Sequence, residues 1–397
     1  TLPKLQLKAK RSPGCLGEID LSNTETKQTP SIDEALLELL AHPNICSKES
    51  YVRQYDFEVG GLSAVKPFGG KSEKTANNSG VIWLGPMGSK NQSAGVCLGH
   101  GITHSLSFID PYLAGIYAVD EAMRNILSTG ADITKVCITD NFCMPDPLPG
   151  KSNVLAEEKL GSLVRLCEGL KDAAIVYKAP LVSGKDSMKN DFMGESNQGE
   201  MVRESIPPTL LVTAMAHVND IAKTLTSDFK NSFSSIYAIG EGDTTLLGSH
   251  YQSLFQVSDN SIPKVPDLEK NYQLFRALST ATSKALVESC HDISDGGLLV
   301  TISESMIGGD LGAVIDLDIR MHDLRSTFFN ESPGRFVVSV ANDQVNEFEN
   351  TFKGLPVLKI GQTSLTQKLV VNNSGKLVFS TALDDLSKAW RSSLWQK

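Results

Sequence analysis

The sequence of 397 residues has no run of 18 apolar residues, which excludes a membrane-spanning helix. Its basic start, residues 1–13, lacks the apolar segment of a signal peptide. Positive charge is also scarce, because 37 Lys and Arg stand against 46 Asp and Glu, and the net charge is −9. This balance, with a sequence pI near 5.4, argues against general binding to nucleic acid or to an anionic membrane surface.

Cysteine pairs are missing as well. The seven cysteines are scattered, odd in number and contain no CxxC motif. This usage predicts reduced thiols in the cytoplasm and no zinc site. The chain also has no initiator Met, so it is expected to be a fragment or a processed product.

The length indicates more than one core. A chain of 397 residues with 41% hydrophobic residues is expected to form two domains. Residues 1–30 are polar and indicate a linker, and residues 31–42 have the capping pattern and leucine spacing of a short helix. The β-rich pattern restarts near residue 218. The sequence therefore predicts an α+β protein with a linker and short helix at 1–44 and domains at 45–217 and 218–397.

The most informative stretch is His-Asp-Ile-Ser-Asp-Gly-Gly at residues 291–297, directly before a predicted helix near 298–307. Asp292 and Asp295 flank the hydroxyl of Ser294. The free N–H groups at the start of a helix attract anions such as phosphate. Carboxylates beside a bound phosphate would repel it unless a cation lies between the carboxylates and the phosphate. The pattern therefore indicates a nucleotide phosphate bridged by Mg²⁺. An acidic turn with Asp295 as the N-cap is the alternative, and both stay open here.

A predicted helix over residues 111–128 carries a second candidate site. Its apolar residues recur with helical spacing, and Gly130 fits its end. Glu121 and Asn125, four residues apart, share the opposite face. Two oxygen ligands on one face suit Mg²⁺, which takes few protein ligands besides phosphate and water. The alternative is a solvated polar face with Arg124 nearby.

Two more segments carry candidate ligand contacts. An apolar strand near residues 180–183 is predicted to run into a Ser-Gly-Lys turn. There Gly184 allows close backbone approach, Lys185 offers a charge to phosphate and Ser187 offers a hydroxyl. The spacing is not that of a Walker A loop. Asp140 ends a predicted strand at 135–139, a common place for a ligand-facing group. An ordinary polar loop and an Asx turn are the alternatives.

The histidines form no catalytic set. His100 and His104 lie four residues apart in a β-like region and are predicted to be loop or surface residues. No Ser-His-Asp or Cys-His arrangement can be assembled from the sequence.

Six phrases occur in order along the chain: Arg53-Gln-Tyr-Asp56, Asp110-Pro-Tyr112 with Asp120-Glu-Ala-Met-Arg-Asn125, Ile138-Thr-Asp-Asn-Phe142, Ser183-Gly-Lys-Asp-Ser187, His291-Asp-Ile-Ser-Asp-Gly-Gly297 and Phe329-Asn-Glu-Ser-Pro-Gly-Arg-Phe336. Together they resemble the phosphoribosylformylglycinamidine synthase family over roughly residues 31–380. Within that family the chain is similar to the second of two homologous synthetase halves. The resemblance implies a two-domain unit of the aminoimidazole ribonucleotide synthetase type, with an N-terminal α/β domain and a C-terminal domain.

The resemblance also implies an activity. In the family reaction ATP phosphorylates the amide oxygen of formylglycinamide ribonucleotide, and ammonia then displaces phosphate to give the amidine. The ammonia comes from glutamine on a separate glutaminase domain or subunit. The matching motif positions imply ATP and substrate contacts at Asp140, Gly184, Lys185 and Ser187. They imply an auxiliary ATP or ADP site with Ser294 and with Mg²⁺ ligands at Glu121, Asn125 and Asp292.

The chain departs from the family pattern in several places. Gly101 stands where many members have an Asp that binds metal, and Lys185 stands where smaller members have an Asn that binds Mg²⁺. The first synthetase half and the glutaminase are absent, so the chain is expected to be inactive alone. Its expected partners are that half and a glutaminase domain or subunit, with a homodimer as a further option. Asp292→Asn is expected to weaken Mg²⁺-ADP binding and to leave the fold intact.

Three readings remain at this point. The chain is part of the synthase, or a non-catalytic nucleotide-binding structural module, or another ATP-using member of the superfamily such as a selenophosphate or thiamine-phosphate kinase type. The phrases at residues 53–56 and 330–336 favour the synthase over the third reading. The sequence does not separate the first two.

Overall fold

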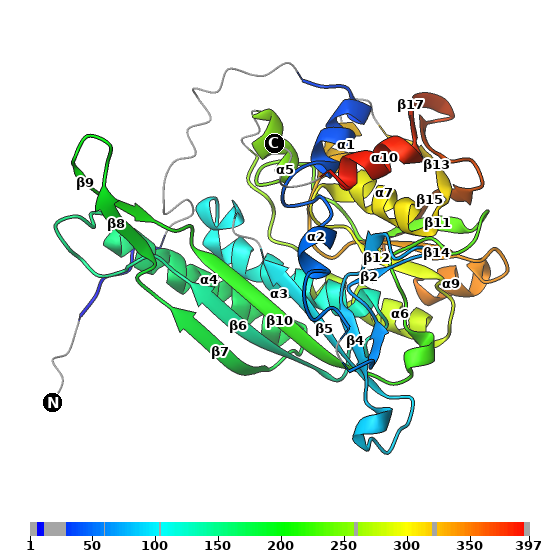
Figure 1. The fold of residues 1–397 in the computed structure, drawn as a ribbon, viewed down its shortest axis with the longest axis horizontal. Helices are drawn as coiled ribbons and strands as arrows, with labels where there is room; N and C mark the ends of the chain where they lie inside the picture. Colours follow the sequence, from blue (N-terminus) through cyan, green and yellow to red (C-terminus); the bar gives the residue numbers. More distant parts are fainter. Residues whose placement is uncertain are drawn as a thin grey trace. The chain divides into compact units, whose positions relative to one another are not determined.

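The structure is a computed structural model that describes residues 6–11, 29–58, 60–102, 105–257, 261–319 and 324–392. The chain divides into two compact units, shown with the chain coloured along its length in Figure 1. One unit comprises Thr1–Thr24, His100–Ala122 and Cys137–Ala214, and the other comprises Glu25–Gly99, Met123–Val136 and Met215–Lys397. Residues 1–5 and 12–28 of the predicted linker and His104 lie outside the described residues.

A six-stranded sheet has the strand order β1-β4-β5-β10-β6-β7. Its strands are β1 (Ser63–Val65), β4 (Gly80–Trp83), β5 (Gly95–Ile102), β6 (Val136–Cys143), β7 (Leu181–Ser187) and β10 (Thr209–Val218). Strands β5, β6 and β10 and helix α3 (Pro111–Ser128) run from one unit into the other along the chain. The predicted helix at 111–128 is confirmed by α3.

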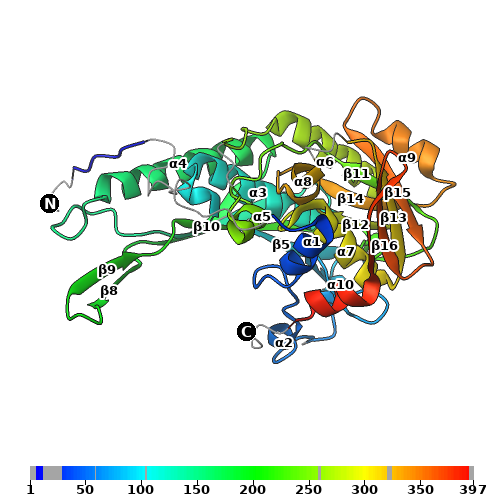
Figure 2. The same ribbon diagram turned by 90° about the horizontal axis from the view of Figure 1, so that it is seen from above.

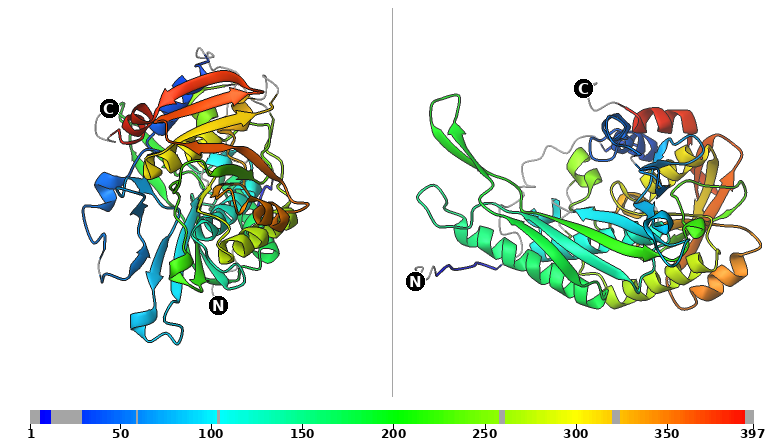
Figure 3. Two further views of the ribbon diagram at one scale, coloured as in Figure 1. Left: turned by 90° about the vertical axis from the view of Figure 1, so that its right-hand side faces the viewer. Right: turned by 60° about the horizontal axis from the view of Figure 1, so that its bottom comes forward.

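In the first unit, α4 (Ala156–Val176) lies along β6 and β7 (Figure 3). Helices α3 and α4 touch through glycine: a Cβ on Gly115 would lie 2.4 Å from the carbonyl oxygen of Leu166, and one on Gly169 would lie 2.1 Å from that of Tyr112. Strand β7 is the edge of the sheet, and its residues are exposed except for the half-buried Ser187. A β8–β9 hairpin (Asp191–Glu195, Met201–Ser205) and η3 (Ser105–Phe108) complete this unit.

The second unit contains a seven-stranded sheet with the order β12-β14-β11-β15-β13-β16-β17. Its strands are β11 (Ser235–Ile239), β12 (Ser289–Asp292), β13 (Gly312–Leu317), β14 (Phe336–Val340), β15 (Val357–Ser364), β16 (Lys368–Asn373) and β17 (Lys376–Ala382). Its helices are α1 (Ile32–Leu40), α2 (Glu49–Val52), α5 (His250–Phe255), α6 (Leu268–Ser283), α7 (Gly297–Gly309), α8 (Leu324–Phe329), α9 (Val345–Thr351) and α10 (Leu383–Trp390). Short pieces are β2 (Phe68–Gly69), β3 (Thr75–Ala76), η2 (Gly85–Met87) and η4 (Ile221–Lys223).

Helices cover both faces of this sheet, as Figure 2 shows from above. Alternate residues of a strand point to opposite faces. On β11, Ile236 belongs to the core formed with α1, α7 and α10, whereas the ring of Tyr237 packs on Phe348 of α9, with centroids 4.9 Å apart. The predicted capping box at the start of α1, formed by Ser31 and Glu34, is present.

Helix α7 is apolar nearly all round, and such a helix has to be buried on every side. Eleven of its residues are buried, including Leu299, Ile302 and Met306. The loop that opens α7 is therefore attached to a helix that is buried on nearly all sides. Among the described residues, no helix is long and apolar enough to cross a membrane.

Candidate functional site

The loop between β12 and α7 holds the acidic glycine motif. The N-cap of α7 is Gly296, with a φ of 78°, and no side chain caps this helix. The alternative with Asp295 as the N-cap is therefore wrong, because the chain turns one residue later, where the carbonyl of Ser294 accepts the N–H of Gly297 at 2.9 Å. Gly297 also has a positive φ, and a Cβ there would lie 2.7 Å from the carbonyl oxygen of Phe328. Packing within the protein thus explains the second glycine.

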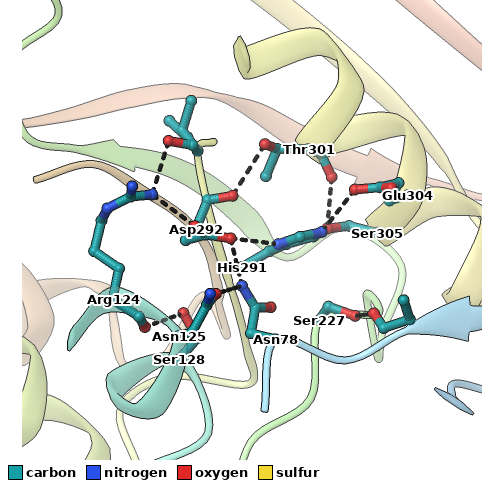
Figure 4. Close-up of polar contacts among 12 residues, drawn as sticks. Asn78, Arg124, Asn125, Ser128, Ser227, His291, Asp292, Thr301, Glu304 and Ser305 are labelled. Carbon is teal, nitrogen blue, oxygen red and sulfur yellow. Dashed lines mark hydrogen bonds and ion pairs between the residues drawn. The ribbon is translucent and has the colours of Figure 1, made fainter. Parts of the chain in front are cut away.

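Asp292, at the end of β12, is 4% exposed and forms a buried ion pair (Figure 4). The Nη1 atom of Arg124 on α3 lies 2.6 Å from its Oδ2 and also donates to the carbonyl of Ile293 at 3.0 Å. Burial alone would raise the pKa of Asp292, but the charges of Arg124 and His291 lower it below its usual value. Arg124, which was expected near a solvated face, is itself buried, with 3% of its surface exposed.

Asn78, in the turn before β4, joins Asp292 to helix α3. Its Nδ2 donates to Oδ1 of Asn125 at 3.0 Å and to Oδ1 of Asp292 (Figure 4). The structure therefore brings Asn125 and Asp292 together, although 167 residues separate them in the sequence. The Oδ1 atom of Asn78 is buried and has no hydrogen-bond partner among the described residues. Sequence analysis missed Asn78, because an Asn-Asn turn carries no distinctive signal.

This cluster fits a hard cation. The Nδ2 group of Asn78 lies between Oδ1 of Asn125 and Oδ1 of Asp292, and a cation can occupy the same place. Oδ1 of Asn78 is a third oxygen, without a hydrogen-bond partner among the described residues. Magnesium prefers such carboxylate and amide oxygens. Arg124 already neutralises one oxygen of Asp292, so the cluster has less negative charge than a site built from several free carboxylates.

His291 extends the charged network away from Asp292. Its Nε2 lies 3.0 Å from Oε2 of Glu304, and its Nδ1 lies 3.5 Å from Oδ1 of Asp292. Burial lowers the pKa of His291, but the two carboxylates outweigh it and raise the pKa to about 9. Trp390 donates to the other oxygen of Glu304 at 2.8 Å. Two cations, from Arg124 and His291, thus alternate with two carboxylates, and the buried group is neutral overall.

Glu121 lies one turn before Asn125 on α3 and is half-buried. Its Oε2 accepts the N–H of Ile102 at 2.8 Å, so this carboxylate faces the end of β5. Gly101 lies directly before Ile102, and a Cβ there would lie 2.1 Å from the carbonyl oxygen of Ala118. The absence of an acidic residue at position 101 therefore has a steric basis: α3 approaches β5 too closely for any side chain.

The predicted Ser-Gly-Lys turn is wrong. Residues 181–187 form the continuous strand β7, because parallel pairing with β6 holds Asp140 opposite Gly184 and Asn141 opposite Lys185. A Cβ on Gly184 would lie 2.5 Å from Oδ1 of Asp140, so the Asp140 carboxylate fills the space over this glycine.

The pleat of β6 and β7 places the four residues that were expected to contact ATP and substrate on two faces of the sheet. Asp140 shares a face with Phe142 and Gly184, since alternate residues point the same way. Lys185 points to the opposite face, where its Nζ lies 3.9 Å from Sγ of Cys143. Ser187 shares that face and its hydroxyl donates to Oδ1 of Asn190 at 3.0 Å. Asp140 and Gly184 thus belong to one side of the sheet, and Lys185 and Ser187 to the other.

Asp140 lines a groove of about 680 Å³ between β6, β7 and α4. Its walls are mostly apolar and include Phe142, Cys167 and Leu170, with the carboxylate of Asp186 facing the same space. Burial, and then the charge of Asp186, raise the pKa of Asp140 above its usual value. Lys171 and Lys178 line the groove as well, so this side of the sheet combines an apolar floor with polar groups of both charges.

Comparison with known proteins identifies the family. The profile described as "AIR synthase related protein, N-terminal domain" matches residues 79–217, and the profile of its C-terminal domain matches residues 231–372. The chain therefore belongs to the AIR synthase related family. The predicted fold class, an α+β unit with two domains of this type, is confirmed.

Individual relatives support the resemblance to phosphoribosylformylglycinamidine synthases, whose synthetase subunit is called PurL. The phosphoribosylformylglycinamidine synthase subunit PurL of Thermoplasma acidophilum is 28% identical over 385 residues, which are 96% of this chain and 47% of the relative. The structure of T. maritima PurL complexed with FGAR has a TM-score of 0.62 at 16% identity, over 90% of this chain and 54% of that one. T. maritima PurL complexed with ADP has a TM-score of 0.61 at 18% identity, over 89% and 51%. The chain thus spans about half the length of the relatives it matches.

Proposed function

We propose that the chain is the second synthetase half of a PurL-type, ATP-dependent ligase that converts formylglycinamide ribonucleotide to its amidine. The proposal is supported by the match to a PurL subunit over 96% of the chain and by the family to which both domains belong. The observation that carries it is the meeting of Asp292 and Asn125 at Asn78, since both were expected at a nucleotide site from distant motifs. The domain limits at 44/45 and 217/218 stay predictions.

In this proposal Asn125 and Asp292 hold Mg²⁺ together with Asn78, and Glu121 contributes from the preceding turn of α3. Ser294 contacts the ATP or ADP whose phosphates the ion neutralises. Arg124 fixes Oδ2 of Asp292, so that Oδ1 faces the cluster with Asn78. At this auxiliary site the protein's part is therefore to position the phosphates and to neutralise their charge.

Strands β6 and β7 of the six-stranded sheet present two separate surfaces for ligand contacts. Lys185 and the half-buried Ser187 share the face of β7 that is opposite the groove and are proposed to contact phosphate of ATP or of the substrate. Asp140, beside Gly184, faces the groove and is proposed to contact the substrate from the other side. The four residues predicted to contact ATP and substrate thus lie on two faces of the sheet.

The proposed partners are the missing synthetase half and a glutaminase domain or subunit. Edge strand β7 supports this, because an unpaired edge with the exposed side chains of Leu181 and Val182 is suited to pairing. A structure of PurLQS from Thermotoga maritima has a TM-score of 0.62 to this chain. A homodimer through the same edge is the alternative. We place the protein in the cytoplasm, in keeping with six free thiols among the described cysteines.

Calorimetry with Mg²⁺-ADP tests the nucleotide site. The parent chain is expected to bind, and Asn78→Ala and Asn125→Ala are each expected to weaken binding by about tenfold, as loss of one oxygen ligand does. Asn91→Ala is the matched control, because this exposed Asn donates only to the carbonyl of Asn219. Equal affinity of all four proteins would show that the cluster is a purely structural hydrogen-bond network.

A second function, a nucleotide-binding structural module without turnover, shares this site. It predicts the same calorimetry but no amidine formation when the missing half and ammonia are supplied. Turnover in the reconstituted system therefore separates the two functions.

A further inference from the structure

A second cluster of metal-ligating side chains lies beside the acidic glycine loop and is not used by the proposed function. It consists of His250 at the start of α5, Asp295 in the loop before α7 and Glu331 in the segment after α8. One ligand atom from each residue lies within 4.8 Å of the other two. Among the described residues this is the one group of three such side chains that meets this limit.

The distances within the cluster match a tetrahedral metal. The Nδ1 atom of His250 lies 3.2 Å from Oε2 of Glu331 and 3.8 Å from Oδ1 of Asp295. Neighbouring ligands of tetrahedral Zn²⁺, with bonds of about 2.0–2.1 Å, are about 3.3–3.4 Å apart. The observed separations bracket that value, so an ion can be bound with small movements of the Asp295 side chain, which is 48% exposed.

The glutamate is already fixed in position. Its Oε1 accepts the N–H of Gly296 at 2.7 Å and the N–H of His250 at 3.0 Å. Both carboxylate oxygens lie beside the imidazole, with Oε1 3.0 Å and Oε2 3.2 Å from Nδ1. The two backbone bonds hold the carboxylate in this place, as in metal sites where hydrogen bonds from neighbouring groups orient a carboxylate ligand. Side-chain exposures of 11% for His250 and 15% for Glu331 show that two of the three ligands are largely shielded from water.

The imidazole is oriented from its other side. Its Nε2 lies 3.0 Å from the side-chain amide of Asn44, and its ring packs edge-on against His42 with centroids 5.0 Å apart. The atom of Asn44 in this contact is Nδ2, which donates to Nε2, so Nδ1 carries the proton of a neutral imidazole and donates it to the Glu331 carboxylate. A metal ion at Nδ1 replaces this proton and faces both carboxylates, and the Asn44 amide then turns so that its Oδ1 accepts the proton on Nε2.

We propose that His250, Asp295 and Glu331 bind a divalent transition metal of the Zn²⁺ class, with the exposed side open to water. The imidazole and the small number of ligands exclude Mg²⁺ and Ca²⁺ as preferred occupants. The lack of paired cysteines, which predicted no zinc site, does not bear on a cluster that contains no cysteine. The ion ties α5 and residue 331 to the loop that carries Ser294, and so stiffens the proposed nucleotide loop.

Metal titration of the full 397-residue chain tests the proposal. Calorimetry with Zn²⁺ is expected to give one tight site per chain that millimolar Mg²⁺ does not displace. Bound Co²⁺ is expected to show the intense visible absorption of a tetrahedral site. His250→Ala should weaken Zn²⁺ binding by about 100-fold or more, and Asp295→Asn by about tenfold, since each removes one ligand.

The controls separate this site from others. His100→Ala removes an exposed imidazole whose Nδ1 lies 2.9 Å from the Thr213 hydroxyl, and it should bind Zn²⁺ like the parent. Asn125→Ala, which alters the proposed Mg²⁺ cluster, should keep the Co²⁺ spectrum. Asp295 is half exposed, so Asp295→Asn is expected to fold even if His250→Ala does not. Absence of Zn²⁺ binding, or unchanged affinity in Asp295→Asn, would overturn the proposal and leave a protonated ion pair.

Discussion

The two aspartates of the glycine loop differ in the side chains that the fold places beside them. Asp292 was expected from its motif to be a metal ligand, and the structure adds Arg124 and Asn78 as its contacts. Two carboxylates three residues apart, Asp292 and Asp295, have different surroundings: the first is buried in an ion pair, and the second is half exposed beside His250. Motif chemistry and structural role therefore have to be assigned residue by residue.

Asp292→Asn should destabilise the fold, which changes the expectation from sequence. The substitution leaves the Arg124 guanidinium buried without a counter-charge, a change that costs about 3–5 kcal/mol in the free energy of unfolding. Urea denaturation of parent and variant measures the loss. The double variant Arg124→Met/Asp292→Leu should recover most of it, because neither charge remains. A loss below about 1 kcal/mol for Asp292→Asn would contradict a buried ion pair.

Asp132, in the turn after α3, should make stability depend on pH in the acid range. Burial raises its pKa, but hydrogen bonds from Thr134, Asn219 and Lys135 outweigh this and lower the pKa to about 2. A lowered pKa adds stability above the unfolded value near 4, and this contribution is lost as the pH falls from about 4 to 2. With the side chain 15% exposed, we expect Asp132→Asn to cost about 1–2 kcal/mol at pH 7.

Denaturation curves at pH 7 and pH 2.5 check this expectation. The difference between parent and Asp132→Asn should be clear at pH 7 and small at pH 2.5. A difference of the same size at both values would mean that the carboxylate charge plays no part.

At the scale of elements, close contacts between helices and strands decide what a position can hold. In the sequence Gly101 stands where many family members have an Asp that binds metal. In the fold the lack of a side chain at this position allows β5 to lie against α3. In the same way, Ser183 to Ser187 read as a turn and form an edge strand, because pairing with β6 outweighs the local turn preference of Ser and Gly. The pleat of the paired strands β6 and β7 then directs Asp140 and Lys185 to opposite sides of the sheet.

Gly101→Ala should therefore destabilise the protein. A Cβ would lie 2.1 Å from the carbonyl oxygen of Ala118 and 2.6 Å from the backbone nitrogen of Ala122, so the helix has to shift. Overpacking of this kind costs about 1–3 kcal/mol, read as a lower melting temperature. Gly150→Ala is the matched control, because nothing lies within 4 Å of its built Cβ. Equal melting temperatures for both variants would contradict the close packing.

At the scale of the whole molecule, the chain is about half the length of the relatives it matches, and its edge strand β7 is exposed. Catalysis by positioning depends on both halves of a clamp being present. The purified chain is therefore expected to show no amidine formation from formylglycinamide ribonucleotide, ATP and ammonia. Addition of the first synthetase half as a separate chain should restore it.

Steady-state assays with and without that half measure this directly. Addition of an unrelated acidic protein at the same concentration is the control for nonspecific stabilisation. Turnover by the chain alone would show that the second half contains a complete site.

The sequence by itself determined the parts of this protein that depend on local periodicity and ordered motifs. The helix at 111–128, the capped helix at α1 and the helix after the glycine loop follow from apolar spacing and caps, and six phrases in order predicted the family. Only the tertiary structure decided which distant side chains meet. Asn78, Arg124 and Asp292 come from three separate segments, as do His250, Asp295 and Glu331. Their contacts depend on chain pairing and packing over long sequence distances, which no local pattern records.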